Sequence, residues 1–157
     1  MTSPVPNASP TTADRRTAQE LLTRRHLIIG WWSLAVFSIL GIALEVLHGF
    51  KIDLYLNVTQ ETRRLMWTLA HAHGTLLSLV HIAFAVTLKS MDLPRGGWSK
   101  IVSTLLILGG ILLPVGFLLG GWMTFHSDPG LGILLVPIGA ICIVLAFTMT
   151  AVNVSRK

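Results

Sequence analysis

Four histidines lie near the ends of long apolar segments, far apart in the sequence but at positions that a four-span membrane topology brings to one face. His48 ends the first segment, His71 and His73 lie near the start of the second, and His126 follows the third. Glu45 precedes His48 by about one helical turn. Ionisable groups inside membrane segments are costly, so they mark functional sites by default. We therefore interpret Glu45, His48, His71, His73 and His126 as one candidate metal site.

This combination of side chains is compatible with three chemistries. Imidazole and carboxylate ligands suit a transition metal such as Cu, Fe or Zn, and an open coordination position would indicate catalysis. A b-type haem could instead take axial ligands of similar depth from two segments, with His48 or His126 paired with His71 or His73. The third chemistry needs no metal, because Glu45 and a histidine could relay protons or act on a quinone.

The two remaining histidines are interpreted differently from each other. His81 lies deeper in the second segment, so it joins the four others as a candidate cofactor ligand. His26 follows Arg24 and Arg25 directly, and we interpret it as part of a positively charged anchor at the opposite membrane face.

Four apolar segments must position these residues, at about 27–48, 65–88, 101–125 and 131–152. Each has the ~20 residues that cross ~30 Å of hydrocarbon as a helix. A soluble bundle would keep a polar stripe on every helix, and the last two segments have almost none. We predict an all-α, integral membrane four-helix bundle over residues 26–157. Residues 1–25, rich in Ser, Thr, Pro and Ala, are predicted to be a disordered tail.

The first segment presents a single polar face. At about 100° per residue, Ser38, Gly41, Glu45 and His48 fall within a sector of roughly 80° on an otherwise apolar helix. In the second segment, Gly74 and His81 share a face, while His71 and His73 lie about 200° apart. The angles do not decide which of these two turns toward the other helices.

The basic residues predict the orientation of the chain. Nine of the twelve Lys and Arg side chains fall on the side of the two termini, and only three fall on the other side. This distribution predicts that both termini are cytoplasmic in a multi-pass protein of the cell inner membrane. The nine are Arg15, Arg16, Arg24, Arg25, Lys89, Arg95, Lys100, Arg156 and Lys157.

Composition excludes several other classes of protein. Of the 157 residues, 52% are hydrophobic and 12% are charged, against roughly 25% charged in soluble domains. The formal net charge of +5 comes from the membrane-flanking residues, so no nucleic-acid partner is expected. A single cysteine allows no internal disulfide, and P-loop and hydrolase motifs are absent, so no enzymatic activity is assigned.

These observations lead to a functional hypothesis with one alternative. We expect a small membrane protein whose His/Glu cluster binds a transition metal or haem b for redox or metal-handling chemistry. The alternative is a non-catalytic accessory subunit or assembly factor of a larger membrane complex, favoured by the plain, Gly-rich third and fourth segments. The expected surroundings are the lipid bilayer, with other subunits or further copies of the chain as possible partners.

Overall fold

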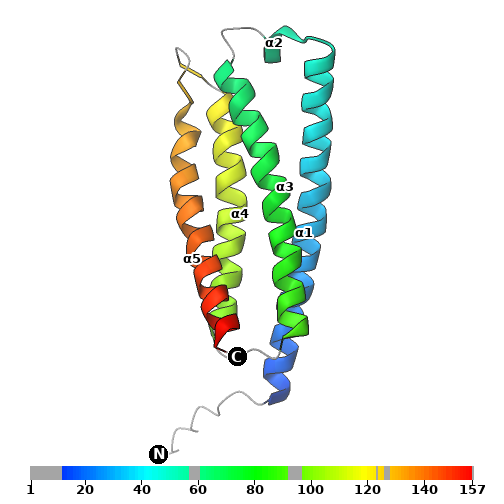
Figure 1. The fold of residues 1–157 in the computed structure, drawn as a ribbon, viewed down its shortest axis with the longest axis vertical. Helices are drawn as coiled ribbons and strands as arrows, with labels where there is room; N and C mark the ends of the chain where they lie inside the picture. The colour runs from blue at the N-terminus through cyan, green and yellow to red at the C-terminus, as the bar shows by residue number, and fades with distance from the viewer. Residues whose placement is uncertain (1–11, 57–60, 92–96, 123, 126–127, 157) are drawn as a thin grey trace, which may run out of the picture.

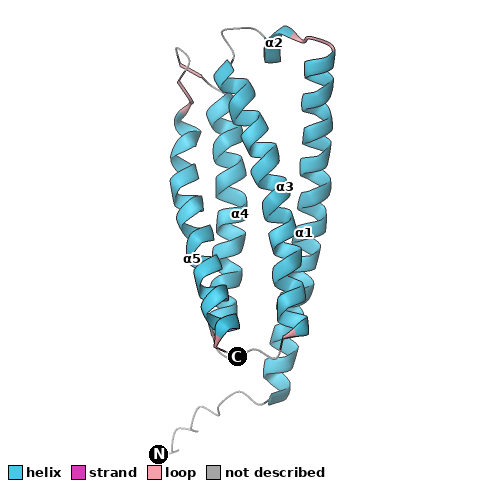
Figure 2. Ribbon diagram, in the orientation of Figure 1, coloured by secondary structure: helices cyan, strands magenta, loops and turns pink. Residues whose placement is uncertain are grey.

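Helices make up nearly all of the described chain. The structure is a computed structural model that describes residues 12–56, 61–91, 97–122, 124–125 and 128–156 (Figures 1 and 2). In chain order the helices are α1 (Thr12–Gly49), α2 (Asp53–Leu56), α3 (Glu61–Ser90), α4 (Trp98–Trp122) and α5 (Leu135–Ser155), with the short 3-10 helix η2 (Leu131–Leu134) leading into α5.

Four of these helices are long and apolar enough to cross a membrane: α1, α3, α4 and η2 with α5. The four predicted segments are thereby confirmed as helices. The predicted tail is wrong in part, because α1 begins at Thr12 and residues 12–25 are helical. Residues 1–11 lie outside the described part of the chain.

The long helices form an open row rather than a closed bundle. In the order α1, α3, α4, α5, each helix packs against the next, and among the described residues α1 makes no contact with α5 (Figure 1). In the most apolar window of α1 and of α5, 11% and 17% of residues are buried, against 39% and 44% in α3 and α4. α1 and α5 are therefore the edges of the row.

The ends of the row carry different elements. Both ends of the described chain lie at one end of the row, which we call the terminal end, and α2 lies at the other, which we call the α2 end (Figure 1). The connected apolar core is built by α3, α4 and α5 and includes Ala70, Phe84, Leu106, Phe117 and Ile143. No residue of α1 belongs to that buried cluster, although Leu22 packs against it.

Glycines set the close approach of α4 and α5. A Cβ atom on Gly109 would lie 2.6 Å from the Ile143 side chain, and one on Gly139 would lie 2.9 Å from the backbone nitrogen of Leu113. Small residues of this kind let membrane helices pack with their backbones close together. The glycine spacing of the third segment therefore serves helix packing.

The C-terminal end of α1 is closed by a Schellman motif. The N–H of Ile52 donates to the Leu47 carbonyl at 3.0 Å, and the N–H of Lys51 donates to the His48 carbonyl at 3.1 Å. Lys51 occupies the left-handed position of this motif, with φ of 53°. Glycine is the residue usually found there, because a side chain in this conformation is strained.

Replacing Lys51 by glycine is therefore expected to stabilise the protein. The substitution removes the strain at φ of 53°, and the greater freedom of glycine in the unfolded chain offsets part of the gain. The net increase in the free energy of unfolding should be about 0.5–1 kcal/mol. Unfolding in mixed detergent micelles by SDS titration measures it, and a Lys51→Gly variant less stable than wild type would contradict the strain argument.

Candidate functional site

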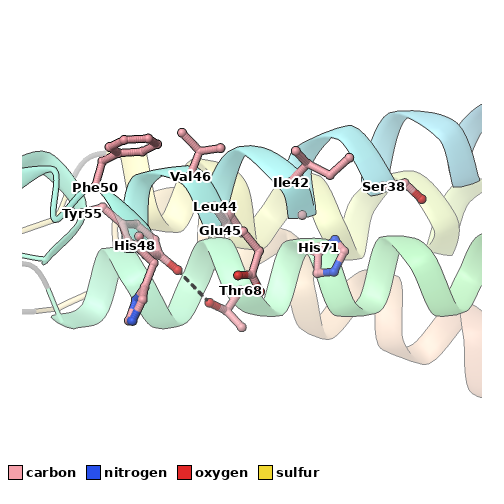
Figure 3. A pocket seen from close by; sticks show the side chains of 12 residues that line it. Ser38, Ile42, Leu44, Glu45, Val46, His48, Phe50, Tyr55, Thr68 and His71 are labelled. Atoms are coloured by element: carbon pink, nitrogen blue, oxygen red, sulfur yellow. Dashed lines mark hydrogen bonds between the residues drawn. The ribbon is translucent and has the colours of Figure 1, made fainter.

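A pocket of about 960 Å³ lies between α1 and α3 at the α2 end and holds three of the predicted site residues. Glu45 and His48 of α1 and His71 of α3 line it. Figure 3 shows these side chains following one another along the space between the two helices. Ser38 and Gly41 also line the pocket, so the polar face predicted for the first segment faces α3.

His71 is held with one ring nitrogen bound and the other available. Its Nδ1 lies 2.8 Å from the carbonyl oxygen of Phe37. A carbonyl only accepts, so Nδ1 carries the proton and Nε2 has a lone pair. Among the described residues Nε2 has no hydrogen-bond partner. A backbone carbonyl that fixes the imidazole tautomer in this way is typical of histidines that ligate a metal.

The sequence of α1 makes room for this ring. A Cβ atom on Gly41 would lie 2.4 Å from Cε1 of His71, closer than any side-chain contact permits. One turn earlier, the Phe37 ring fills the space beside Gly74 of α3 in the same manner. The space beside Gly74 is thus filled by the Phe37 ring, and the space beside Gly41 is filled by the His71 ring.

Glu45 and His48 are exposed in the mouth of the pocket, toward the α2 end. The His48 ring meets the buried Tyr55 of α2 edge to face, with centroids 6.4 Å apart. The Tyr55 hydroxyl lies 3.3 Å from the Thr68 hydroxyl of α3, which joins α2 to α3 at the pocket rim (Figure 3).

Arg63 fixes the same end of the row from the other side of α3. Its guanidinium donates to the carbonyls of Gly121, at 3.1 Å, and Leu54, at 3.3 Å, and lies 5.8 Å from the centroid of the Trp67 ring. The Trp67 indole in turn donates to the Leu118 carbonyl at 3.3 Å. These contacts tie α2, α3 and α4 together and hold the pocket walls in place.

The remaining predicted ligands are not brought into this pocket. His73 turns toward α4, where its ring packs against Phe117 with centroids 5.0 Å apart, and its Nδ1 donates to the Leu69 carbonyl of its own helix at 2.8 Å. His126 lies outside the described residues. Within the described ranges no group of three or more His, Cys, Asp or Glu side chains is placed to hold a metal ion.

A second polar cluster lies nearer the terminal end. The interpretation of one of its residues, His26, from the sequence was wrong. His26 of α1 is fully buried, not part of an exposed anchor. Its Nδ1 lies 2.7 Å from Nδ1 of His81, and its Nε2 lies 2.8 Å from the Ser103 hydroxyl of α4. The two imidazole rings stack with centroids 4.9 Å apart. This cluster joins three helices through buried hydrogen bonds.

The depth of the two histidines could have revealed this pair. His26 lies 23 residues before the end of α1, and His81 lies 20 residues after the start of α3. Consecutive antiparallel helices place such residues at nearly the same level. The neighbouring Arg24 and Arg25, both exposed, concealed this signal, because they suggested that the membrane boundary lies at His26.

Comparisons with known proteins give no further assignment. No protein-family model, curated protein or solved structure matches the chain.

Proposed function

We propose that the protein binds a b-type haem in the α2-end pocket, with Nε2 of His71 as an axial ligand. The single observation that carries this proposal is the His71 ring, whose Nδ1 is bound to the Phe37 carbonyl and whose Nε2 is left with a lone pair in the pocket. A bound haem would supply one-electron transfer. With both termini in the cytoplasm, as the basic residues predict, the pocket lies in the outer half of the inner membrane.

Haem is favoured over a bare metal ion because the two differ in the ligands they require. A mononuclear Cu or Zn site needs about three or four protein ligands, and the described residues offer no such group. Haem needs one or two axial ligands and an apolar space for the macrocycle. The pocket of about 960 Å³ has apolar walls that include Ile42, Leu44 and Val46.

Haem is also favoured over an oxidised quinone. The oxygens of an oxidised quinone only accept hydrogen bonds. Nε2 of His71 is also an acceptor, because the proton of that ring is on Nδ1, so the two cannot form a hydrogen bond. Glu45 and His48 at the pocket mouth would lie close to a haem bound in the pocket and would there hold or move a proton.

The experiment is an absorption spectrum of the full chain purified in detergent, oxidised and then reduced with dithionite, together with iron, copper and zinc analysis. We expect a Soret band and about one iron per chain. His71→Ala should lose haem, because no other ligand occupies that position. His73→Ala is the matched control and should keep it, since His73 faces α4.

Two results would contradict the haem proposal. One is a wild-type protein with no Soret band, with or without copper or zinc. The other is a His71→Ala variant that keeps as much haem as His73→Ala.

The open row of helices favours a second candidate, an accessory subunit of a larger membrane complex. α1 and α5 do not contact each other among the described residues, and large apolar side chains such as Trp31 and Trp32 are exposed along the edge helix α1. A partner helix could cover such an edge. Stable co-purification of a membrane partner, together with wild-type behaviour of the His48, His71 and His73 variants, would decide for this candidate.

A further inference from the structure

Three pockets follow one another along α1, two of them between α1 and α3 and the middle one lined by α4 as well. Residues 16–27 of α1 line a pocket of about 590 Å³ at the terminal end, residues 28–37 line a middle pocket of about 340 Å³, and residues 38–50 line the α2-end pocket. Together the three pockets extend along nearly the whole length of α1. Their order is the basis for an inference that does not depend on haem.

The polar cluster of His26, His81 and Ser103 adjoins the middle pocket, which His81 lines. All three side chains are buried, with exposed fractions of 0%, 3% and 2%. Phe84 covers the His26 ring edge-on, with centroids 4.8 Å apart. Bulk water therefore does not reach the hydrogen bonds between these side chains, and a proton passing from Ser103 to His81 would have to use the side chains.

The hydrogen bonds in this cluster form a continuous chain. The order is Ser103 hydroxyl, Nε2 and Nδ1 of His26, then Nδ1 and Nε2 of His81. Each neutral imidazole carries one N–H and one lone pair. All hydrogen bonds of the chain must therefore run from donor to acceptor in the same direction, either toward His81 or toward Ser103. Nε2 of His81 faces Gly110 in the middle pocket, where a Cβ atom on that glycine would lie 2.9 Å from it.

We propose that Ser103, His26 and His81 are a proton-transfer chain in a path that runs along α1, beside α3 and α4, across the membrane. The Ser103 hydroxyl proton moves to Nε2 of His26, the Nδ1 proton of His26 moves to Nδ1 of His81, and the Nε2 proton of His81 leaves into the middle pocket. Ser103 regains a proton from the terminal side. One proton is thereby transferred, and each broken N–H or O–H bond leaves the lone pair that accepts the next proton.

Further polar groups lie along α1 before and after this hydrogen-bonded chain. The terminal-end pocket holds Gln19 and Thr23, about two turns and one turn before His26. It also holds the cations Arg16, Arg24 and Lys89 and the carboxylate Glu20. The middle pocket holds Ser33 and Ser78. Pockets lined by such groups can hold ordered water.

The backbone also contributes polar groups at the middle pocket. Pro114 has no N–H, so the Gly110 carbonyl lacks its usual helical donor. Further along α1, the α2-end pocket begins at Ser38, and the Phe37 carbonyl, between the two pockets in the sequence, accepts from His71. Glu45 and His48 are the titratable groups at the far mouth.

The test is proton entry into vesicles that contain the purified full chain, a pH-sensitive dye inside and a potassium diffusion potential set with valinomycin. We expect the rate of proton entry with wild type to exceed that of protein-free vesicles by about a hundredfold, the lower end of what positioned proton-transfer groups contribute to a rate. Ser103→Ala removes one oxygen atom at the end of the chain and should lose most of this excess. Ser103→Thr keeps a hydroxyl and should retain at least half of it.

The matched control is Thr104→Ala, which removes a hydroxyl from the neighbouring, exposed position, where Oγ1 bonds to the Lys100 carbonyl of the same helix. It should conduct like wild type. Size-exclusion profiles of all variants report folding, and their haem spectra separate this question from the proposed function. Wild type no faster than protein-free vesicles, or Ser103→Ala as fast as wild type, would overturn the proton path.

Discussion

Replacing His26 by leucine is expected to lower the free energy of unfolding by about 1–3 kcal/mol. Leucine fills a similar space but leaves Nδ1 of His81 and the Ser103 hydroxyl without the partners that now lie 2.7 and 2.8 Å away. An orphaned buried polar group costs more than the hydrogen bond gained, although hydrogen bonds between membrane helices are at the weak end of the scale. SDS titration of the protein in mixed micelles gives the value.

A triple variant, His26→Leu with His81→Leu and Ser103→Ala, distinguishes orphaned polar groups from lost packing. Removing all partners together leaves nothing unsatisfied, so this variant should lie within about 1 kcal/mol of wild type. His73→Leu is the control, because the hydrogen bond of His73 lies within its own helix. This variant should lower the free energy of unfolding by less than about 1 kcal/mol. A triple variant less stable than His26→Leu would show that packing, and not hydrogen bonding, governs this site.

Gly139→Val is expected to destabilise the contact of α4 with α5 by about 2–3 kcal/mol. Its Cβ would lie 2.9 Å from the backbone nitrogen of Leu113, and backbone atoms cannot move aside as a side chain does. The two helices must therefore separate, and the core contacts of Ile143 and Ala146 are weakened with them. Thermal unfolding in detergent, followed by circular dichroism, measures the loss.

Gly49→Ala is the control for that substitution, because no atom lies within 4 Å of where its Cβ would be placed. Its free energy of unfolding should lie within a few tenths of a kcal/mol of the wild-type value. Equal stability of Gly139→Val and wild type would mean that α4 and α5 do not pack as closely as the structure places them.

Hydropathy was sufficient to predict the four long helices that are apolar enough to cross a membrane, because about 20 apolar residues in a row have few alternative explanations. Helical angles were sufficient to group Ser38, Gly41, Glu45 and His48, which line one pocket in the structure. Both inferences use only short-range periodicity, and helices preserve that periodicity over their whole length.

Short-range periodicity does not show which neighbouring helix each face of a helix contacts. His71 and His73 lie about 200° apart on one helix, and the row places α1 on one side of α3 and α4 on the other. One histidine therefore faces each neighbour, and the predicted cluster is divided. The pairing of His26 with His81, 55 positions away, was missed for a different reason: α1 begins at Thr12, so Arg24 and Arg25 do not mark the end of the helix.

The absence of α1 from the buried apolar cluster has a consequence for how the molecule opens. α3, α4 and α5 hold one another through that cluster, whereas α1 packs almost entirely on α3, through close contacts such as Phe37 on Gly74 and through the hydrogen bonds of His26 and His71. Loosening α1 leaves the cluster itself assembled, so we expect α1 to open at a lower free energy than α3 and α4. Backbone amides of α1 should then exchange with solvent deuterium through local opening, long before those of α3 and α4, which exchange only when the whole protein unfolds.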